Sequence, residues 1–338
     1  MNPTIATEED LEEALSRPTP ALADELARLD GDLIVLGVAG KMGPTLARMA
    51  RRALAPKRAV LGAARFSNPR AREALERAGV KTLPCNLLDR RDVERLPDAA
   101  AVVFMAGMKF GSTGAEAETW ATNAYLPGLV AERYPKLRTV VFSSGNIYPF
   151  VTPASGGATE ATPPAPVGEY AQSALGRERV FDYFSRRNGT PTAMYRLNYA
   201  VELRYGILLD IAQKVWSGAP VDVRTGYVNV IWQGDANAMA LRCLAAAESP
   251  ASVWNVTGPE TLSVRDLAAR FGELLGKKPV VEGKEEPTAL LSNASKALSR
   301  FGRPTPVESL LPWVAHWVKA GGATLNKPTH FETRDGKF

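Results

Sequence analysis

The chain has 338 residues, of which 45% are hydrophobic and 23% are charged, and its formal net charge is +5. This balance is typical of a globular protein and excludes a disordered, collagenous or coiled-coil chain. No apolar run approaches the roughly 20 residues that a membrane helix needs, and the acidic start lacks the apolar core of a secretory signal. Two cysteines are too few for a disulfide framework, so we expect a cytoplasmic protein without a membrane partner.

The composition also narrows the chemistry. The only two histidines, His316 and His330, occur late in the chain, so a zinc site or a Ser-His-Asp hydrolase would depend on them. His316 lies in Trp313–Trp317, which is typical of a packed helix, and we expect it in the core or on the surface. We predict no metal site. The basic residues are scattered and accompany no nucleic-acid motif, which argues against a nucleic-acid partner.

Residues 1–30 are predicted to form a helical arm, in which Thr7 and Asp10 make a capping box. From Asp32 onward, short apolar runs alternate with amphipathic helices. This alternation predicts a Rossmann-like, doubly wound α/β domain with a parallel sheet over 31–198. The expected strands are Leu33–Leu36, Ala59–Leu61, Lys81–Leu83, Ala101–Met105, Thr139–Phe142 and Thr192–Arg196. The expected helices are Pro44–Leu54, Pro69–Ala78, Asp92–Leu96, Glu118–Tyr134 and Glu169–Arg187.

The second half is predicted to form a smaller substrate-binding annex over 199–320, partly interleaved with the first domain. The proline-rich stretch Pro149–Pro166 is expected to be a loop over one end of the sheet. The polar tail over 321–338 is expected to wrap the surface or to fray. Further helices are expected within Tyr199–Ala219 and over Asp235–Ala247, Val264–Leu275, Ser292–Phe301 and Val307–Ala320, with strands over Asn229–Trp232 and Val253–Val256.

A glycine turn with the spacing G-x-x-G-x-x-G follows the first strand and precedes Pro44, which suits the start of a helix. Glycine lets the backbone turn tightly and approach a pyrophosphate closely, while the helix N-terminus offers unpaired N–H groups to the anion. The order strand, glycine turn, helix therefore favours dinucleotide binding over a purely structural turn. The residues assigned to the cofactor are Gly37, Gly40, Lys41, Met42 and Gly43.

The end of the second strand bears on the choice of cofactor. An acidic residue there would bind the adenosine ribose and favour NAD, but Leu61–Ser67 contains none. Arg65 is suited to a 2′-phosphate, with Ser67 nearby. We therefore predict NADP, with NAD as the alternative. The alternative that Arg65 only stacks on the adenine or faces solvent stays open.

Three later segments, Asn86–Asp89, Phe104–Gly111 and Ser143–Tyr148, complete an ordered set of motifs with the glycine turn. The set resembles the extended short-chain dehydrogenase/reductase family, in its NAD-dependent epimerase/dehydratase group, which includes UDP-galactose 4-epimerases. The resemblance runs over roughly 32–320. It implies reversible hydride transfer at a C–OH carbon of a carbohydrate or nucleotide sugar.

The resemblance also implies residue roles. Asn86 and Leu87 would lie beside the adenine, although the family has an acidic residue where Asn86 stands. Serine at 144 matches the catalytic hydroxyl, and Tyr170 follows at the spacing of the catalytic tyrosine, which also contacts the cofactor. The segment after the fourth strand and the helix beyond it would add Ala106, Gly107, Lys109 and Asn123 to the cofactor site. Substrate contacts would come from Gly145, Asn146 and Asn198.

One departure from the family motif Y-x-x-x-K stands out, because the chain has Ala174 where the lysine belongs. Residues i and i+4 share one helix face, so a lysine at 174 would lie beside the Tyr170 hydroxyl. Its charge would favour the phenolate of a side chain whose ordinary pKa is about 10. Arg177 is two turns away, about 10 Å along the axis, and substitutes poorly unless it folds back. Lys109 is another candidate, although its implied role is elsewhere in the site.

Three interpretations stay open. In the first, the protein is an active epimerase, dehydratase or reductase with a divergent proton relay. In the second, it is a cofactor-binding sensor or partner subunit without hydride chemistry. In the third, it is an ordinary enzyme inactivated at Ala174. A nucleotide sugar and a free sugar or sugar acid are equal substrate candidates, and Arg204 and Arg224 are candidates for a diphosphate. The resemblance alone implies a homodimer through Glu118–Tyr134 and Glu169–Arg187.

Overall fold

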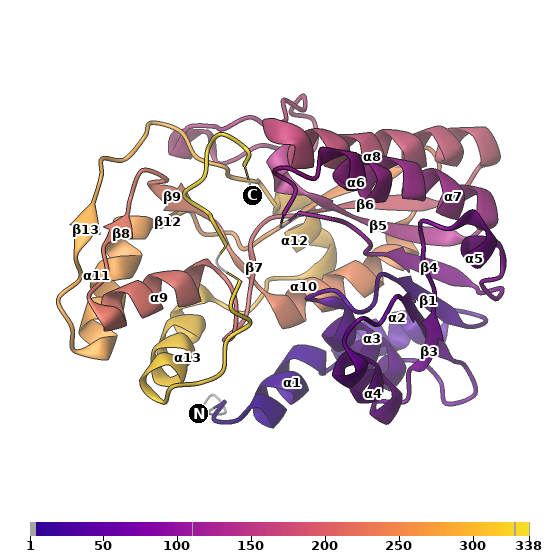
Figure 1. The fold of residues 1–338 in the computed structure, drawn as a ribbon, viewed down its shortest axis with the longest axis horizontal. Helices are drawn as coiled ribbons and strands as arrows, with labels where there is room; N and C mark the ends of the chain where they lie inside the picture. Colours follow the sequence, from indigo (N-terminus) through magenta and orange to yellow (C-terminus); the bar gives the residue numbers. More distant parts are fainter. Residues whose placement is uncertain (1–4, 110, 328, 338) are drawn as a thin grey trace.

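The computed structural model describes residues 5–109, 111–327 and 329–337; Phe110, within one of the family-like segments, lies outside them. A seven-stranded parallel sheet forms the centre of the molecule, with the strand order β11-β6-β5-β4-β1-β2-β3 (Figure 1). The chain runs outward from β1 in one direction to β3 and then in the other direction from β4 to β6. This reversal is the hallmark of doubly wound sheets and confirms the predicted fold class.

The central strands are short and apolar, as expected for strands covered on both faces. Every residue of β1, β2 and β4 is buried. The second strand begins one residue later and ends three residues later than predicted, because Gly62–Ala64 continue the pairing with β1 and β3. The sheet strands are β1 (Leu33–Leu36), β2 (Val60–Ala64), β3 (Lys81–Pro84), β4 (Ala101–Phe104), β5 (Arg138–Ser144), β6 (Thr192–Leu197) and β11 (Ser252–Val256).

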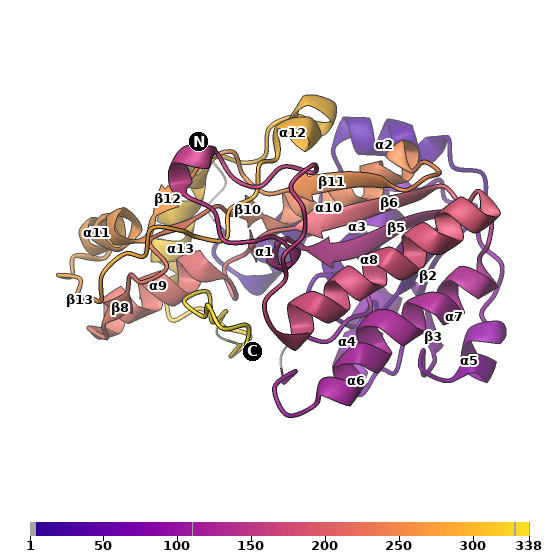
Figure 2. The ribbon, with the colours of Figure 1, turned by 90° about the horizontal axis from the view of Figure 1, so that it is seen from above.

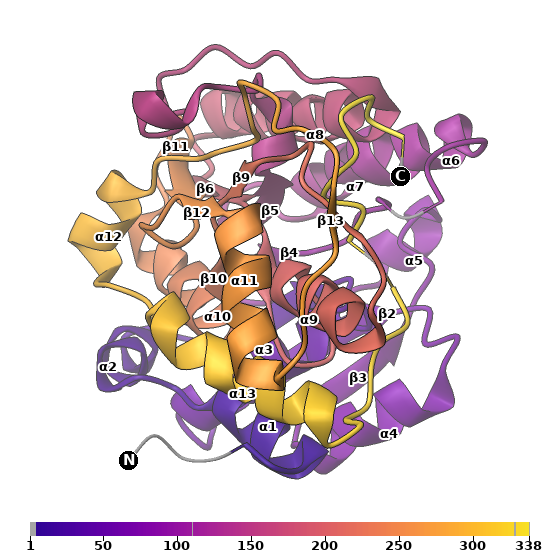
Figure 3. The ribbon, with the colours of Figure 1, turned by 90° about the vertical axis from the view of Figure 1, so that its left-hand side faces the viewer.

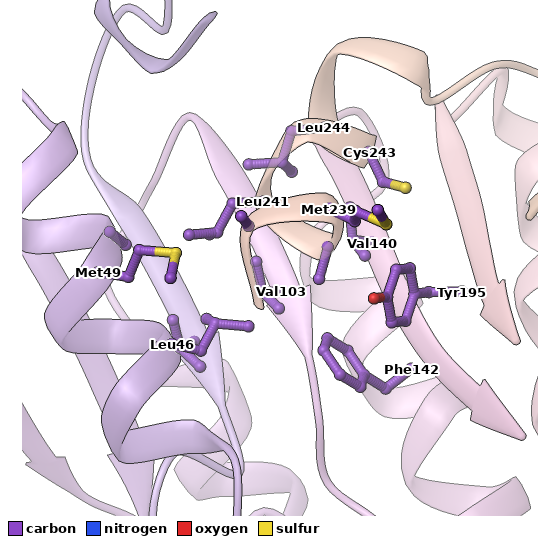
Figure 4. Packing of buried hydrophobic residues seen from close by; sticks show 14 of the residues in the cluster. Leu46, Met49, Val103, Val140, Phe142, Tyr195, Met239, Leu241, Cys243 and Leu244 are labelled. Atoms are coloured by element: carbon purple, nitrogen blue, oxygen red, sulfur yellow. The ribbon is translucent and has the colours of Figure 1, made fainter. Parts of the chain in front are cut away.

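Helices cover both faces of the sheet. In Figure 4, side chains from α3 and α10 lie against Val103, Val140 and Phe142 of the strands. Figure 2 shows α8 lying along the opposite face, with α7 beside it. The first face carries α2 (Pro20–Ala27), α3 (Gly43–Ala53), α4 (Pro69–Arg77) and α10 (Gln233–Arg242); the second carries α5 (Arg90–Glu94), α6 (Glu116–Trp120), α7 (Leu126–Arg133) and α8 (Gly168–Asn188).

The helix predicted over Glu118–Tyr134 is interrupted. Between α6 and α7, the segment Ala121–Tyr125 forms a π-helical turn, closed by a hydrogen bond from the Leu126 N–H to the Ala121 carbonyl. Pro127 has no N–H to complete an α-helical bond to the carbonyl of Asn123, which favours the wider turn. Such turns are frequent at functional sites, and this one carries Asn123.

The annex, which faces the viewer in Figure 3, has a hydrophobic core of its own. The predicted capping box at Thr7 and Asp10 is present, and Leu11 and Leu15 of α1 (Glu8–Ser16) are buried in this core. The helices of the annex are α9 (Ile207–Ser217), α11 (Val264–Leu275) and α13 (Val307–Lys319), with α12 (Ser295–Phe301) beside the sheet. Its short strands are β7 (Ala200–Val201), β8 (Val221–Asp222), β9 (Tyr227–Val228), β10 (Ile231–Trp232), β12 (Leu262–Ser263) and β13 (Val281–Glu282).

The C-terminal segment does not fray where it is described. It runs from α13 back towards the start of α8, in yellow in Figures 1 and 2. Thr329 and Phe331 are buried, and Arg334 donates hydrogen bonds to Thr288. Gly336 packs against Gly168 so closely that a Cβ on Gly168 would lie 2.5 Å from the Gly336 carbonyl oxygen. Among the described residues, no helix is long and apolar enough to span a membrane.

Candidate active site

A cavity of about 140 Å³ lies at the carboxyl edge of the sheet, where the annex meets the central domain. Ligands of doubly wound proteins bind at this edge, at the point where the strand order reverses. The cavity gathers residues from the glycine turn, the loop after β4, the end of β5, the first turn of α8 and the segment after β6. Seven of the residues assigned from sequence line it: Lys41, Met42, Lys109, Ser144, Asn146, Tyr170 and Asn198.

The glycine turn is built from three positions with different demands. Gly37 has φ +84°, and a Cβ there would lie 2.6 Å from the Ala106 nitrogen. A Cβ on Gly43 would collide with the Val38 carbonyl, so both glycines are needed for packing. Gly40 is exposed, and the one atom near its virtual Cβ is the Gly37 carbonyl oxygen at 3.3 Å. Its missing side chain leaves the outer face of the turn open, as close approach of a pyrophosphate requires.

Two half-buried lysines reach the cavity from different loops. Lys41 Nζ donates a hydrogen bond to the Ala200 carbonyl over 3.1 Å and lies 3.7 Å from the centroid of the Tyr205 ring. Lys109 Nζ lies 5.8 Å from the centroid of the Tyr170 ring. Within the described residues the cavity lining contains no carboxylate, so the cavity suits an anionic ligand.

Burial controls the charge of both lysines. It lowers the pKa of Lys41 to about 7, a shift that Glu202 opposes and the positive charge of Lys109 reinforces. Burial also lowers the pKa of Lys109 to about 8. An anion in the cavity would restore their protonated forms, because an opposite charge nearby favours the charged state.

The hydroxyl groups assigned to catalysis share this cavity. Ser144 ends β5, and its Oγ donates to Asn146 Oδ1 over 2.9 Å and accepts from the Asn146 N–H over 3.1 Å. Tyr170 is half-buried in the first turn of α8. The neighbouring Ser143 instead donates to Glu178 inside the protein. Ser144 is therefore the serine of this pair whose hydroxyl is exchangeable with a ligand.

Asn123 organises the site from behind. Its side chain is fully buried, and its Nδ2 donates to the Met108 carbonyl and to Ser173 Oγ, each over 2.9 Å. Its Oδ1 accepts the Met108 N–H over 2.9 Å. One amide thus holds the loop that carries Lys109 against the helix that carries Tyr170.

Asn198 and Gly145 join the sheet to the annex. Asn198 is 2% exposed, and its Nδ2 donates to Asn229 Oδ1 over 2.7 Å. A Cβ on Gly145 would lie 3.0 Å from Asn198 Oδ1, so glycine allows the turn after β5 to pack on that amide. Asn198 therefore reaches a ligand only through the oxygen side of its amide.

The remaining residues assigned from sequence lie outside the cavity. Arg65 is exposed at the end of β2. Asn86 is exposed after β3, and its Oδ1 accepts the Leu88 N–H over 3.3 Å. Leu87 and Ala106 are buried in the core on the α8 face, and Gly107 is the third residue after the end of β4. The edge formed by these segments continues from the cavity along β1 towards β2 and β3.

Among the side chains that line the cavity, sequence reasoning missed two tyrosines and one threonine. Tyr199 and Tyr205 come from the segment between β6 and α9, and Thr329 comes from the C-terminal segment. The position of Asn198 at the end of β6 could have pointed to the two tyrosines, whereas nothing near Thr329 in the sequence marks it. His316 and His330 are exposed, and neither lines the cavity.

The fold is that of a doubly wound α/β protein, and the edge of its sheet brings Ser144 and Tyr170 to one cavity. Residues 33–201, half of the chain, match the family model described as NAD dependent epimerase/dehydratase family. The chain belongs to this family, as its motifs predicted. No curated protein matches it.

Solved structures of similar fold include several sugar epimerases. The UDP-glucose 4-epimerase of Thermotoga maritima, solved with UDP-glucose, has a TM-score of 0.71 and 16% identity over 86% of this chain and 99% of its own. The UDP-glucuronic acid 4-epimerase of Bacillus cereus, solved with UDP-glucuronic acid and NAD, has a TM-score of 0.72 and 16% identity over 85% of this chain and 99% of its own. A putative epimerase of Burkholderia cenocepacia has a TM-score of 0.68 and 22% identity over 87% of this chain and 99% of its own. At these identities the likeness establishes the shared fold.

Proposed function

We propose that the protein is an NAD(P)-dependent oxidoreductase of the epimerase/dehydratase type that acts on a carbohydrate or nucleotide sugar. The observation that carries this proposal is the convergence of Ser144 and Tyr170 with Lys41 and Lys109 on one cavity beside the glycine turn. The UDP-sugars and NAD bound by proteins of similar fold support it.

The residues present fit a dinucleotide. The open face of Gly40 and the N-terminus of α3 would hold the pyrophosphate, and Lys41 and Lys109 would add positive charge beside it. When bound, the dinucleotide would supply the hydride-transfer chemistry at a C–OH carbon. The exposed Arg65 at the end of β2 supports NADP, with NAD as the alternative.

The side chains that line the cavity would have separate roles in proton transfer and substrate binding. Ser144 would turn its hydroxyl from Asn146 to the substrate oxygen and polarise it. Tyr170 would take the proton of the reacting hydroxyl and give it back, as a general base and acid. Asn146 and the oxygen side of Asn198 would orient the substrate, because both line the same cavity.

Turnover of a panel of sugars, sugar acids and nucleotide sugars with each cofactor tests the proposal. Tyr170→Phe and Ser144→Ala should each lower turnover by about 10²–10⁴-fold while leaving cofactor affinity within a few-fold of wild type. Tyr227→Phe is the matched control, because Tyr227 is a half-buried tyrosine of the annex that does not line the cavity. Full turnover by Tyr170→Phe would contradict the assignment.

A cofactor-binding sensor or partner subunit is the second candidate. Ala174 favours it, because this fully buried alanine packs against Ile147, Tyr148 and Ala158 and brings no charge to the lysine position. Cofactor binding without turnover of any substrate in the panel would support the sensor over the enzyme.

We also propose a homodimer through the outer faces of α6, α7 and α8. Three large side chains on these helices and the π-turn are strongly exposed: Trp120 at 38%, Tyr125 at 54% and Tyr183 at 57%. Exposed aromatic residues that cluster on one face are typical of protein interfaces. Sedimentation equilibrium of wild type and Tyr125→Glu tests this; a wild-type monomer at micromolar concentration would contradict it.

A further inference from the structure

Arg177, which the sequence offered as a substitute for the missing lysine only if its side chain folds back, is a buried cation. It belongs to α8, two turns after Tyr170, and is 5% exposed. Its guanidinium donates to the Phe142 carbonyl over 2.7 Å and to Asn123 Oδ1. A Cβ on Gly107 would lie 2.6 Å from Arg177 Nη2, so the guanidinium also lies against the loop after β4.

The side chain of Arg177 folds back along the helix towards its N-terminus, as long helical side chains do. The evidence is Asn123, which contacts both the Arg177 guanidinium and Ser173 Oγ. The positive charge therefore lies near the level of Ser173, the residue directly before Ala174. The sequence suggested Arg177 as a substitute for the missing lysine only if its side chain folds back, and these contacts show that it does.

In the part of the chain that the structure describes, no carboxylate pairs directly with Arg177. Both hydrogen-bond acceptors of its guanidinium are neutral, and within the described residues its Nε has no hydrogen-bond partner. The adjacent carboxylate, Glu178, is bound instead by Arg196 and Ser143. Burial lowers the pKa of the Arg177 guanidinium, and attraction to the negative form of Tyr170 is the first influence that opposes this shift.

We propose that Arg177 supplies the positive charge that stabilises the Tyr170 phenolate, in place of the lysine that the family carries at the position of Ala174. Arg177 acts through Tyr170 and is a positioning residue, not a catalytic one. The inference rests on the proposed function for its biological meaning, but the ionisation it describes does not depend on any substrate.

Other titratable groups face Tyr170 and must be separated from Arg177. Lys109, from the loop after β4, lies 5.8 Å from the ring centroid. Tyr205, from the segment before α9, lines the same cavity, and the negative form of Tyr170 contributes to raising its pKa. Lys41 approaches from the glycine turn. The test therefore includes Lys109→Met alongside the Arg177 variants.

The measurement is a phenolate titration by ultraviolet absorbance, in which the signal of Tyr170 is the difference between each protein and the same protein carrying Tyr170→Phe. It needs neither cofactor nor substrate. Arg177→Met should move the midpoint of Tyr170 ionisation upward by about one to three pH units. Arg177→Lys should keep most of the wild-type behaviour, and Arg179→Met, an exposed arginine of the same helix, should change nothing.

A rescue variant distinguishes charge from structure. In Arg177→Met/Ala174→Lys the cation returns at the family position, and the midpoint should return towards the wild-type value. If Arg177→Met does not fold, Arg177→Lys and the rescue variant still decide the question, because both keep a cation on this face of α8. Three results would overturn the proposal. The midpoint of Tyr170 ionisation could be unchanged in folded Arg177→Met, or it could be raised in both folded variants that keep a cation. It could also shift in Lys109→Met alone.

The titration and the turnover assay fail separately. If the midpoint depends on Arg177 but the protein turns over no substrate, this inference is supported and the proposed enzymatic function is contradicted. If the wild type turns over substrate but the midpoint does not change when Arg177 is replaced, the proposed function is supported and this inference is contradicted.

Discussion

Arg196 and Glu178 form a buried ion pair between β6 and α8, with Arg196 Nη2 2.7 Å from Glu178 Oε2. Their side chains are 7% and 5% exposed. Burial alone would lower the pKa of Arg196, but the hydrogen bonds and charge of Glu178 raise it overall. Because Ser143 also donates to Glu178, the pair holds the end of β5, and with it Ser144, against the helix that carries Tyr170.

Removing one member of this pair should be costly. Glu178→Ala leaves the Arg196 guanidinium buried without its partner, and we expect a loss of about 3–5 kcal/mol in the free energy of unfolding. Asp182→Ala breaks the more exposed pair with Arg186 on the same helix and should cost about 0–1 kcal/mol. Urea denaturation of the two variants checks the difference. Equal losses would show that the buried pair contributes no more to the free energy of unfolding than the exposed pair.

Two glycines of the turn should affect different properties, Gly40 cofactor binding and Gly37 stability. Gly40→Val should fold with a melting temperature near that of wild type and lose dinucleotide binding, because its side chain would cover the open face of the turn. Gly37→Val should destabilise the protein, because φ is +84° and the Ala106 backbone leaves no space. Calorimetric titration and thermal melts check both. Unchanged binding by Gly40→Val would place the cofactor elsewhere.

Cofactor binding should depend on pH through Lys41 and Lys109. Burial lowers their pKa values to about 7 and about 8, so both lose positive charge as the pH rises through this range. The affinity for the anionic dinucleotide should therefore fall between about pH 7 and pH 9, by up to about tenfold per unit for each proton taken up on binding. Lys41→Met should flatten the profile, and Lys57→Met, at an exposed lysine, should leave it unchanged. A flat wild-type profile would contradict this.

Arg65 should determine the preference between the two cofactors. Arg65→Ala should weaken NADP binding by about tenfold, which corresponds to about 1.4 kcal/mol, and leave NAD binding unchanged. Parallel titrations with both dinucleotides give the comparison. A wild-type preference for NAD of tenfold or more would exclude the proposed contact with a 2′-phosphate.

Ala174→Lys alone should be less stable than Ala174→Lys/Arg177→Met. The exchange of alanine for lysine costs only a few tenths of a kcal/mol in helix propensity. However, Ala174 is fully buried, and the single variant would place a second cation beside the Arg177 guanidinium in a water-poor region. Melting temperatures of the two variants test this ordering, and the opposite ordering would mean that the two side chains do not meet.

The sequence predicted the features that depend on local pattern. The apolar runs of β1 and β4 and the glycine turn follow from patterns along short segments, whereas the pairing of Ser144 with Tyr170 came from the family resemblance. Features that depend on packing between distant segments were out of reach. The contact of Arg177 with Asn123 requires the side chain to fold back onto a neighbouring helix, and Thr329 reaches the cavity only because the C-terminal segment crosses the annex.

The course of that C-terminal segment matters for anyone who prepares the protein. Thr329 forms part of the cavity wall, and Gly336 lies against Gly168, two residues before Tyr170. A purification tag fused after this segment would emerge beside the first turn of α8. A polyhistidine tag there would bring many imidazoles, each able to exchange protons near neutral pH, close to a site whose own lining contains no histidine among the described residues. Binding and titration experiments therefore need protein from which any such tag has been cleaved.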